Sequence, residues 1–314
     1  MDERTHSFAA FLKKRFPGRR VRKIPIDAGF TCPNRDGTLG YDGCVFCDPY
    51  AAGPVATAGW TIERQVEMRL RRSPGTSFIA YFQANCNTHA PQDELRRCYQ
   101  AALGHPRVVG LAVATRPDAL PAPTLALLQE LAGRTWLSVE LGLQSIHERS
   151  LAWLRRRHTY AQFVSAFVEL RRRGIDVVVH LIVGIPGETR GDMRATIAAV
   201  NALRPAGVKF HLLHVLRGSE LQARHERGEL PLLQREEYVD ILCDLLERLD
   251  PGIVVHRLAV DREAGLFIAP AWALDKAAVL RAVTGELRRR GGFQGRLARA
   301  SAPGPAVDKR APML

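Results

Sequence analysis

Residues 29–47 read Gly-Phe-Thr-Cys-Pro-Asn-Arg-Asp-Gly-Thr-Leu-Gly-Tyr-Asp-Gly-Cys-Val-Phe-Cys, and the rest of the chain is organised around this loop. It holds three of the six cysteines, Cys32, Cys44 and Cys47, in the spacing C-x11-C-x2-C. Its glycines, asparagine and aspartates tolerate the unusual backbone angles needed to wrap a compact inorganic centre. A structural zinc site normally has four Cys or His ligands, and no fourth stands nearby. Three cysteines instead suit a cubane iron–sulfur cluster with one iron left open.

Outside the loop, short apolar strands alternate with helices of ten or more residues. This rhythm implies a parallel sheet with right-handed crossovers. We therefore predict an α/β fold, an open, partial TIM-type barrel of about six parallel βα units over residues 21–225, with its chemistry at the C-terminal strand ends. The predicted strands are 21–27, 77–83, 107–114, 136–142, 176–183 and 208–215. The predicted helices are 5–16, 60–72, 91–103, 121–132, 146–155, 160–173 and 190–203.

The two ends of the chain are predicted to lie outside this barrel. Residues 1–20 form an N-terminal helix and lead-in. Residues 226–297 form a small C-terminal α/β extension packed on the barrel, with helices at 234–249 and 272–290 and a short strand at 253–258. Residues 298–314 are rich in proline and lack apolar periodicity, so we predict a disordered tail.

Composition limits the partners and the compartment. Hydrophobic residues make up 46% of the 314, without an apolar run as long as a membrane span. The charged N-terminus lacks a signal core, so we expect a cytoplasmic protein without membrane association, whose cysteines are ligands, reactive thiols or core residues. The formal charge of +13, mostly from arginine, would attract RNA. Solvated arginines on helix surfaces would give the same charge.

The loop resembles the cluster loop of radical S-adenosylmethionine (SAM) enzymes, in which an aromatic residue, here Phe46, directly precedes the last cysteine. The familiar spacing there is C-x3-C-x2-C. The wider gap of this chain resembles a bacterial group related to the catalytic subunit of Elongator, and the likeness runs from about residue 8 to about 297. The resemblance implies a 4Fe–4S cluster on Cys32, Cys44 and Cys47, with SAM on the open iron and Phe46 beside them.

Several strand ends resemble the SAM-binding segments of that superfamily. Gln83 occupies the place of a Gly-Gly-Glu segment that contacts the SAM amino group. Residues 140–145, Glu-Leu-Gly-Leu-Gln-Ser, resemble a Gly-x-Gln-Ser signature, which implies that Glu140 and Ser145 face SAM and that Gln144 lies near its ribose. Glu140 also lies within an apolar strand, where an unpaired carboxylate is costly to bury, so it needs an arginine or a cationic ligand group as its partner.

Two further segments complete the implied SAM site. Arg157 stands where relatives keep an arginine for the SAM carboxylate, and its neighbours Arg155 and Arg156 are interpreted as ordinary surface charges. Gly184 and Pro186 lie in a Gly-Ile-Pro-Gly turn that resembles the segment packed against adenine. Read alone, such a turn is often only a turn.

The sequence leaves the catalytic residues open. Lys209 and His211 alternate along one predicted strand and share a face, which lines the substrate cavity if it points into the barrel. Cys86 follows the second strand and is a further candidate, although a core role is the more common one for such a cysteine. His180 and His256 are predicted to be core residues.

The resemblance implies an enzyme that reduces its cluster, cleaves SAM and generates a 5′-deoxyadenosyl radical, with flavodoxin or ferredoxin as the reductant. Kinship with Elongator and the basic charge favour modification of wobble uridine in tRNA, although the chain is too short for the acetyltransferase domain of the Elongator subunit. Two alternatives remain: a radical SAM enzyme acting on a small metabolite or peptide, and a zinc-stabilised RNA-binding protein without catalysis.

Overall fold

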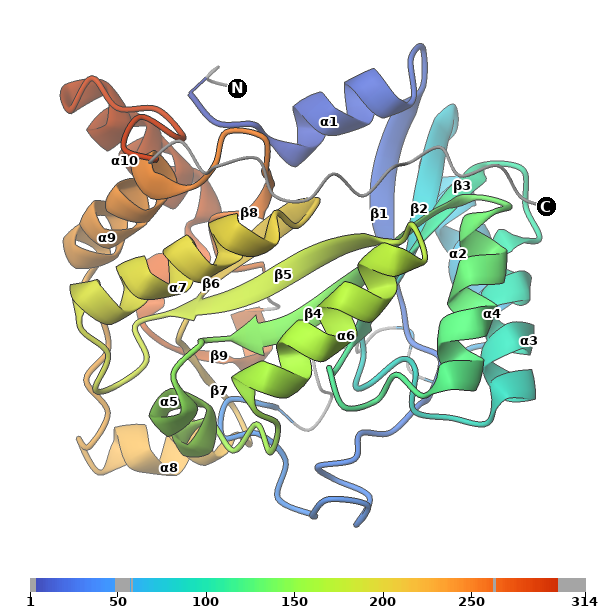
Figure 1. Ribbon diagram of the computed structural model, residues 1–314, viewed down its shortest axis with the longest axis horizontal. Coiled ribbons are helices and arrows are strands. Elements are labelled where there is room, and N and C mark those ends of the chain that lie inside the picture. The colour runs from blue at the N-terminus through green and yellow to red at the C-terminus, as the bar shows by residue number, and fades with distance from the viewer. Residues whose placement is uncertain (1–3, 49–56, 58, 262–263, 299–314) are drawn as a thin grey trace.

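The computed structural model describes residues 4–48, 57, 59–261 and 264–298. Its centre is a curled sheet of seven parallel strands in the order β1-β2-β3-β4-β5-β6-β8 (Figure 1). The prediction of an open α/β barrel is therefore confirmed, with one strand more than expected, because β8 from the predicted extension pairs with β6. The strands are β1 (Arg20–Ile26), β2 (Thr76–Phe82), β3 (Val108–Thr115), β4 (Trp136–Gln144), β5 (Asp176–Val183), β6 (Gly207–Leu212) and β8 (Val254–Arg257).

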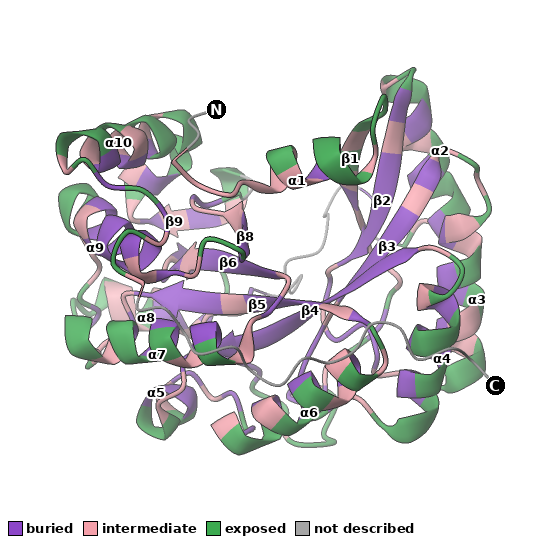
Figure 2. Cartoon of the chain, turned by 45° about the horizontal axis from the view of Figure 1, so that its top comes forward, coloured by how far each residue is buried: buried purple, intermediate pink, exposed green. Residues whose placement is uncertain are grey.

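Helices cover one face of this sheet and turn their exposed residues away from it (Figure 2). Several begin at caps that satisfy the free backbone N–H groups of the first turn. Thr159 and Thr189, for example, form capping boxes with Gln162 and Asp192. The helices are α2 (Ile62–Arg72), α3 (Gln92–Leu103), α4 (Ala122–Ala132), α5 (Glu148–Trp153), α6 (Tyr160–Arg172), α7 (Arg190–Leu203), α8 (Glu220–Glu226), α9 (Arg235–Arg248) and α10 (Lys276–Arg289).

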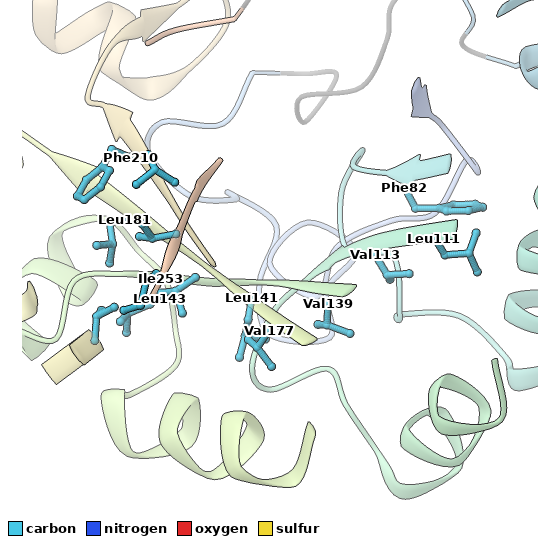
Figure 3. Close-up of a cluster of buried hydrophobic side chains, with 14 of the residues drawn as sticks. Phe82, Leu111, Val113, Val139, Leu141, Leu143, Val177, Leu181, Phe210 and Ile253 are labelled. Atoms are coloured by element: carbon cyan, nitrogen blue, oxygen red, sulfur yellow. The ribbon is translucent and has the colours of Figure 1, made fainter. Parts of the chain in front are cut away.

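The hydrophobic core lies between the sheet and these helices. Alternate residues of each strand point toward it, such as Val139, Leu141 and Leu143 of β4, all with 0% exposure. Figure 3 shows these side chains together with Phe82 of β2 and Phe210 of β6. Burial of a side chain of this size contributes about 1.5–3 kcal/mol, so this face supplies much of the stability of the fold. The opposite residues of the same strands are free to line the interior of the barrel.

The N-terminal segment closes part of the gap between the two edge strands. Helix α1 (Phe8–Arg15) lies between β1 and β8 (Figure 1). Ser7 forms a parallel bridge with Val255, whose N–H donates to the carbonyl of His6 at 2.8 Å. The ring of Phe8 stacks on His256 with centroids 4.1 Å apart. The predicted N-terminal helix thus forms part of the wall of the barrel interior.

The main differences from the predicted elements follow β6. The strand ends at Leu212, so His214 lies beyond it, and a separate antiparallel pair forms from β7 (Val215–Leu216) and β9 (Phe267–Ala269). Helix α8 was not predicted. Two 3-10 turns, η2 (Ala264–Leu266) and η3 (Ala271–Leu274), flank β9. In the described part of the chain, the helices are too short or too polar to cross a bilayer. The predicted tail lies outside the described residues, apart from 298.

Candidate functional site

A cavity of about 1210 Å³ occupies the interior of the barrel, and the three cysteines of the loop line it. Side chains from the inward positions of the strands complete the lining, among them Tyr81 of β2 and Glu140 of β4. Of the described residues along it, ten are lysine or arginine and two, Glu140 and Asp261, are acidic. The cavity is therefore a cationic environment next to the cysteine loop.

Backbone hydrogen bonds fix the loop that follows β1. The N–H of Gly43 donates to the carbonyl of Asn34 at 2.8 Å, which brings the two ends of the wide gap together. The N–H of Cys47 donates to the carbonyl of Cys44 at 3.0 Å, so a single turn joins these two thiols. Between them, the N–H of Val45 donates to Leu154, and its carbonyl accepts from Leu221. The loop is thus held by the ends of α5 and α8.

Arg156 connects Cys44 to the sheet. Its guanidinium donates to the Cys44 sulfur at 3.3 Å and to the carbonyl of Gly142 at 3.2 Å. A hydrogen bond from Cys47 and the nearby charge of Arg156, which together outweigh burial, hold the pKa of Cys44 well below its usual value. A Cβ added to Gly142 would lie 2.8 Å from the Nη2 atom of Arg156. The glycine therefore makes room for the arginine.

Arg116, just after β3, has an uncommitted donor beside the cavity. Its Nε and Nη2 atoms bind Asp118 at 2.9 and 2.7 Å, and Nη2 also reaches the carbonyl of Arg156. Its Nη1 atom is buried without a hydrogen-bond partner among the described residues. Because a buried unsatisfied donor is costly, this nitrogen is suited to a bound anion. Asp118 fixes the orientation in which it is presented.

The donor set agrees with a cluster better than with a single ion. In the described part of the chain, His, Cys, Asp and Glu side chains do not converge in threes around one metal position. A cubane needs no such convergence, because each of its three cysteines binds a different iron. Three thiols on one cavity, with an arginine beside Cys44 and the uncommitted Nη1 of Arg116, fit a 4Fe–4S cluster that carries an anionic ligand.

The other residues that the resemblance would place against SAM divide into two groups. Those that line the cavity are Phe46, Gln83, Glu140 and Gln144. Those outside its lining are Ser145, Arg157, Gly184 and Pro186. Ser145 donates to Glu188 at 2.5 Å, and the side chain of Leu233 covers Gly184. Arg157 turns outward to the carbonyl of Leu39 and to Asp42. Arg156, not Arg157, enters the cavity.

The chain itself supplies the cations that bind Glu140. Lys23 of β1 binds one carboxylate oxygen, while Lys209 of β6 and His180 of β5 bind the other, the histidine at 2.8 Å. Burial alone would raise the pKa of Glu140, but these neighbours hold it well below its usual value. Burial lowers the pKa of Lys209 more than its contact with Glu140 raises it. The expected arginine or ligand partner is thus replaced by two lysines and a histidine.

The candidate catalytic residues also divide into those that line the cavity and one that does not. Lys209 and His211 both line the cavity, as predicted for an inward-facing strand face. His180 and His256, which we expected in the core, line it too. Cys86 has 0% exposure, lies outside the lining, and has its sulfur 3.3 Å from the Thr115 hydroxyl.

Sequence reasoning missed Arg156 and Lys23 as site residues. It noticed Arg116, in a polar Thr-Arg-Pro-Asp turn at the end of a predicted strand, but left a salt bridge to Asp118 and a substrate role equally open. No sequence signal pointed to Lys23, which lies in the middle of a basic strand, 117 residues before Glu140.

Comparison with known proteins places the chain among related sequences. Residues 31–218 match the family described as the Radical SAM superfamily, and residues 205–289 match the Radical_SAM C-terminal domain. YtqA of Bacillus subtilis strain 168 is 40% identical over 303 residues, covering 94% of this chain and 93% of YtqA. The tRNA uridine(34) acetyltransferase of Methanocaldococcus jannaschii is 31% identical over 165 residues, 52% of this chain and 30% of that protein.

Among solved structures, an archaeal Elp3 from Methanocaldococcus infernus, lacking its N-terminal residues, superposes with a TM-score of 0.67. The match is 19% identical and covers 88% of this chain but 64% of that one, so the chain spans less than two thirds of that protein. At this identity the superposition supports the same fold.

Proposed function

Because the chain belongs to the Radical SAM superfamily, whose members use a 4Fe–4S cluster and SAM, we propose that Cys32, Cys44 and Cys47 hold this cluster. When bound and reduced, the cluster and SAM supply a 5′-deoxyadenosyl radical that removes a hydrogen atom from the substrate. The observation that carries this proposal is the meeting of three thiols from one loop with Arg116 and Arg156 in a single cavity.

We assign the SAM carboxylate to Arg116, because its Nη1 atom is a buried donor that still needs an acceptor. Gln83, Gln144 and Phe46 line the same cavity and would complete the cofactor site. Arg156 acts on the cysteine instead, since it donates to the Cys44 sulfur and so favours the thiolate that an iron ligand requires.

We further propose that the substrate is tRNA and that the modified base is the wobble uridine. Half of the chain is similar to a tRNA uridine(34) acetyltransferase. The excess of ten basic over two acidic residues along the cavity suits a nucleic acid, as does the formal charge of +13. Flavodoxin or ferredoxin is the proposed reductant.

The test of the enzyme class begins with anaerobic purification and reconstitution with iron and sulfide. Electron paramagnetic resonance with and without SAM, and chromatography for 5′-deoxyadenosine after reduction, are then recorded. We expect a cluster signal that SAM perturbs and that Cys44→Ala abolishes. Cys86→Ala is the matched control and should keep the cluster, because this thiol lies outside the cavity lining. Stoichiometric zinc without deoxyadenosine would reject the proposed site.

The substrate is tested separately, by tandem mass spectrometry of tRNA nucleosides from a deletion strain and from a strain that expresses Cys44→Ala. Loss of one uridine modification in both strains, with its precursor accumulating, is expected. Binding of tRNA to the purified enzyme should weaken steeply as salt rises. An unchanged nucleoside profile would reject the tRNA proposal and leave the cluster assignment standing.

A further inference from the structure

The cavity continues beyond the cysteines to a basic cluster formed by Lys23, His180, Lys209, His211 and His256. These side chains come from β1, β5, β6 and β8, and all of them line the cavity. His180 and Lys209 are direct partners in neighbouring strands, and the rings of His180 and His211 lie 5.0 Å apart. Strands far apart in the sequence thus place their basic residues together.

Too little negative charge faces this cluster to balance it. Glu140, with 0% side-chain exposure, binds both Lys23 and Lys209, so two amines share one carboxylate, and this share does not offset the burial that lowers the pKa of Lys209. The other acidic residue along the cavity, Asp261, instead lies 3.8 Å from Arg257 and 3.3 Å from Lys276. A buried charge without a counterion is unfavourable. One bound anion would therefore balance the positive charge of this cluster.

The cluster also keeps donors for such an anion. Each ammonium group has three N–H donors. Lys209 uses one on Glu140 and one on the Tyr81 hydroxyl at 3.1 Å. Within the described residues, the Nε2 atom of His211 is buried without a hydrogen-bond partner. Lys209 and His211 share the inward face of β6, so both can approach one ligand from the same side.

The distance from the cysteines suits a substrate. On β4, Gly142 accepts the hydrogen bond from Arg156, whose other nitrogen contacts the Cys44 sulfur. Glu140 stands two residues earlier on the same inward face, which is about 6.6 Å along a strand. A group bound at Lys209 would thus lie in the same cavity as the proposed cofactor, about two strand residues closer to the N-terminal ends of the strands.

We propose that this basic cluster binds an oxyanion of the substrate, a carboxylate or a phosphate, and so orients the molecule below the cofactor. The inference rests on the proposed function, since it treats the cavity as a shared cofactor and substrate site. It goes further in naming the chemistry of the substrate group and the residues that hold it.

The test is isothermal titration calorimetry of the reconstituted enzyme saturated with SAM, whose carboxylate then occupies Arg116, with inorganic phosphate, acetate and, as a neutral control, acetamide, at constant ionic strength. One anion is expected to bind once per chain, and acetamide is not. Tighter binding of phosphate would indicate a phosphorylated group, and tighter binding of acetate would indicate a carboxylate. If neither anion binds to enzyme that forms deoxyadenosine, the inference is wrong while the proposed function stands.

Variants locate the binding. Lys209→Met should weaken the preferred anion about tenfold or more, because it removes a charged donor from the cluster. Lys276→Met removes the same charge from a more exposed part of the lining and should change the affinity less than about twofold. Equal losses of anion affinity in the two variants would mean that the anion is held by general electrostatic attraction, and the proposed binding site would be wrong. His211→Asn, which leaves the charge unchanged, should also weaken binding of the anion. This variant replaces Lys209→Met in the test if Lys209→Met does not fold.

Loss of the cluster or of SAM cleavage in the wild-type enzyme would be a failure of the proposed function. That result would be visible in the absorbance and deoxyadenosine measurements, independently of the anion titration.

Discussion

The ion network of Glu140 makes a stability prediction that can be worked from the structure. The substitution Glu140→Gln keeps the shape of the side chain but removes its charge. Lys23 and Lys209, whose side chains are only 14% and 5% exposed, then have no anionic partner among the described residues around them. Breaking one side of a buried ion pair typically costs about 3–5 kcal/mol. Since a domain is stable by only about 5–15 kcal/mol, the expected loss is a large share of the total.

The assay is urea unfolding at pH 7, followed by tryptophan fluorescence. The midpoint of Glu140→Gln should fall far below that of the wild type. The double variant Glu140→Gln/Lys209→Met should regain part of the loss, because it also removes one of the two stranded charges. Glu169→Gln is the matched control: Glu169 also contacts two cations, Arg172 and Arg173, but on the exposed surface of α6. If Glu140→Gln unfolds at the same urea concentration as this control, the network does not stabilise the fold as argued.

Three further outcomes are expected. Burial lowers the pKa of His158 to about 3 and that of His180 to about 4, so the unfolded chain, with histidines near 6.5, binds protons first on acidification. The unfolding free energy, measured with urea, should therefore fall by about 2 kcal/mol per histidine between pH 7 and pH 5; a constant value would contradict the burial of neutral histidines. Gly142→Ala should displace Arg156, and iron content per chain should drop; full iron content would show that the arginine can move without consequence. Arg116→Gln should weaken SAM binding about 10- to 100-fold, measured by calorimetry, because a charge-assisted hydrogen bond is lost, and unchanged affinity would remove Arg116 from the cofactor site.

The sheet and the cysteine loop could be predicted because their signals are local. The alternation of apolar strands and amphipathic helices is written in neighbouring residues, and β2 through β5 lie where the pattern placed them. The loop carries three cysteines within sixteen residues, 32–47, so their meeting on one cavity needs no distant contact. β8 was harder, because a four-residue strand has little periodicity and its place depends on pairing with β6.

The sequence does not predict which of the three consecutive arginines, 155–157, enters the cavity. Arg155, Arg156 and Arg157 are chemically identical, and only the backbone distinguishes them. Arg155 and Arg157 have φ angles of 53° and 54°, in the left-handed region that non-glycine residues rarely adopt. These two residues turn outward, to Glu220 and to Asp42, while Arg156 points inward to Cys44. A conformation of this kind is set by the packing of the loop and not by the identity of its residues.

The partners of Glu140 bear on how the cavity is divided. The sequence resemblance would have this carboxylate face SAM, yet Lys23, Lys209 and His180 already occupy both of its oxygens. A cofactor amine placed there would add a positive charge to the basic cluster, which already lacks enough negative charge. The uncommitted donor of Arg116 and the polar side chain of Gln83 instead lie at the strand ends, on the side of the cysteines. The charges thus favour the cofactor at the strand ends and an anionic substrate group one layer deeper, beside Glu140.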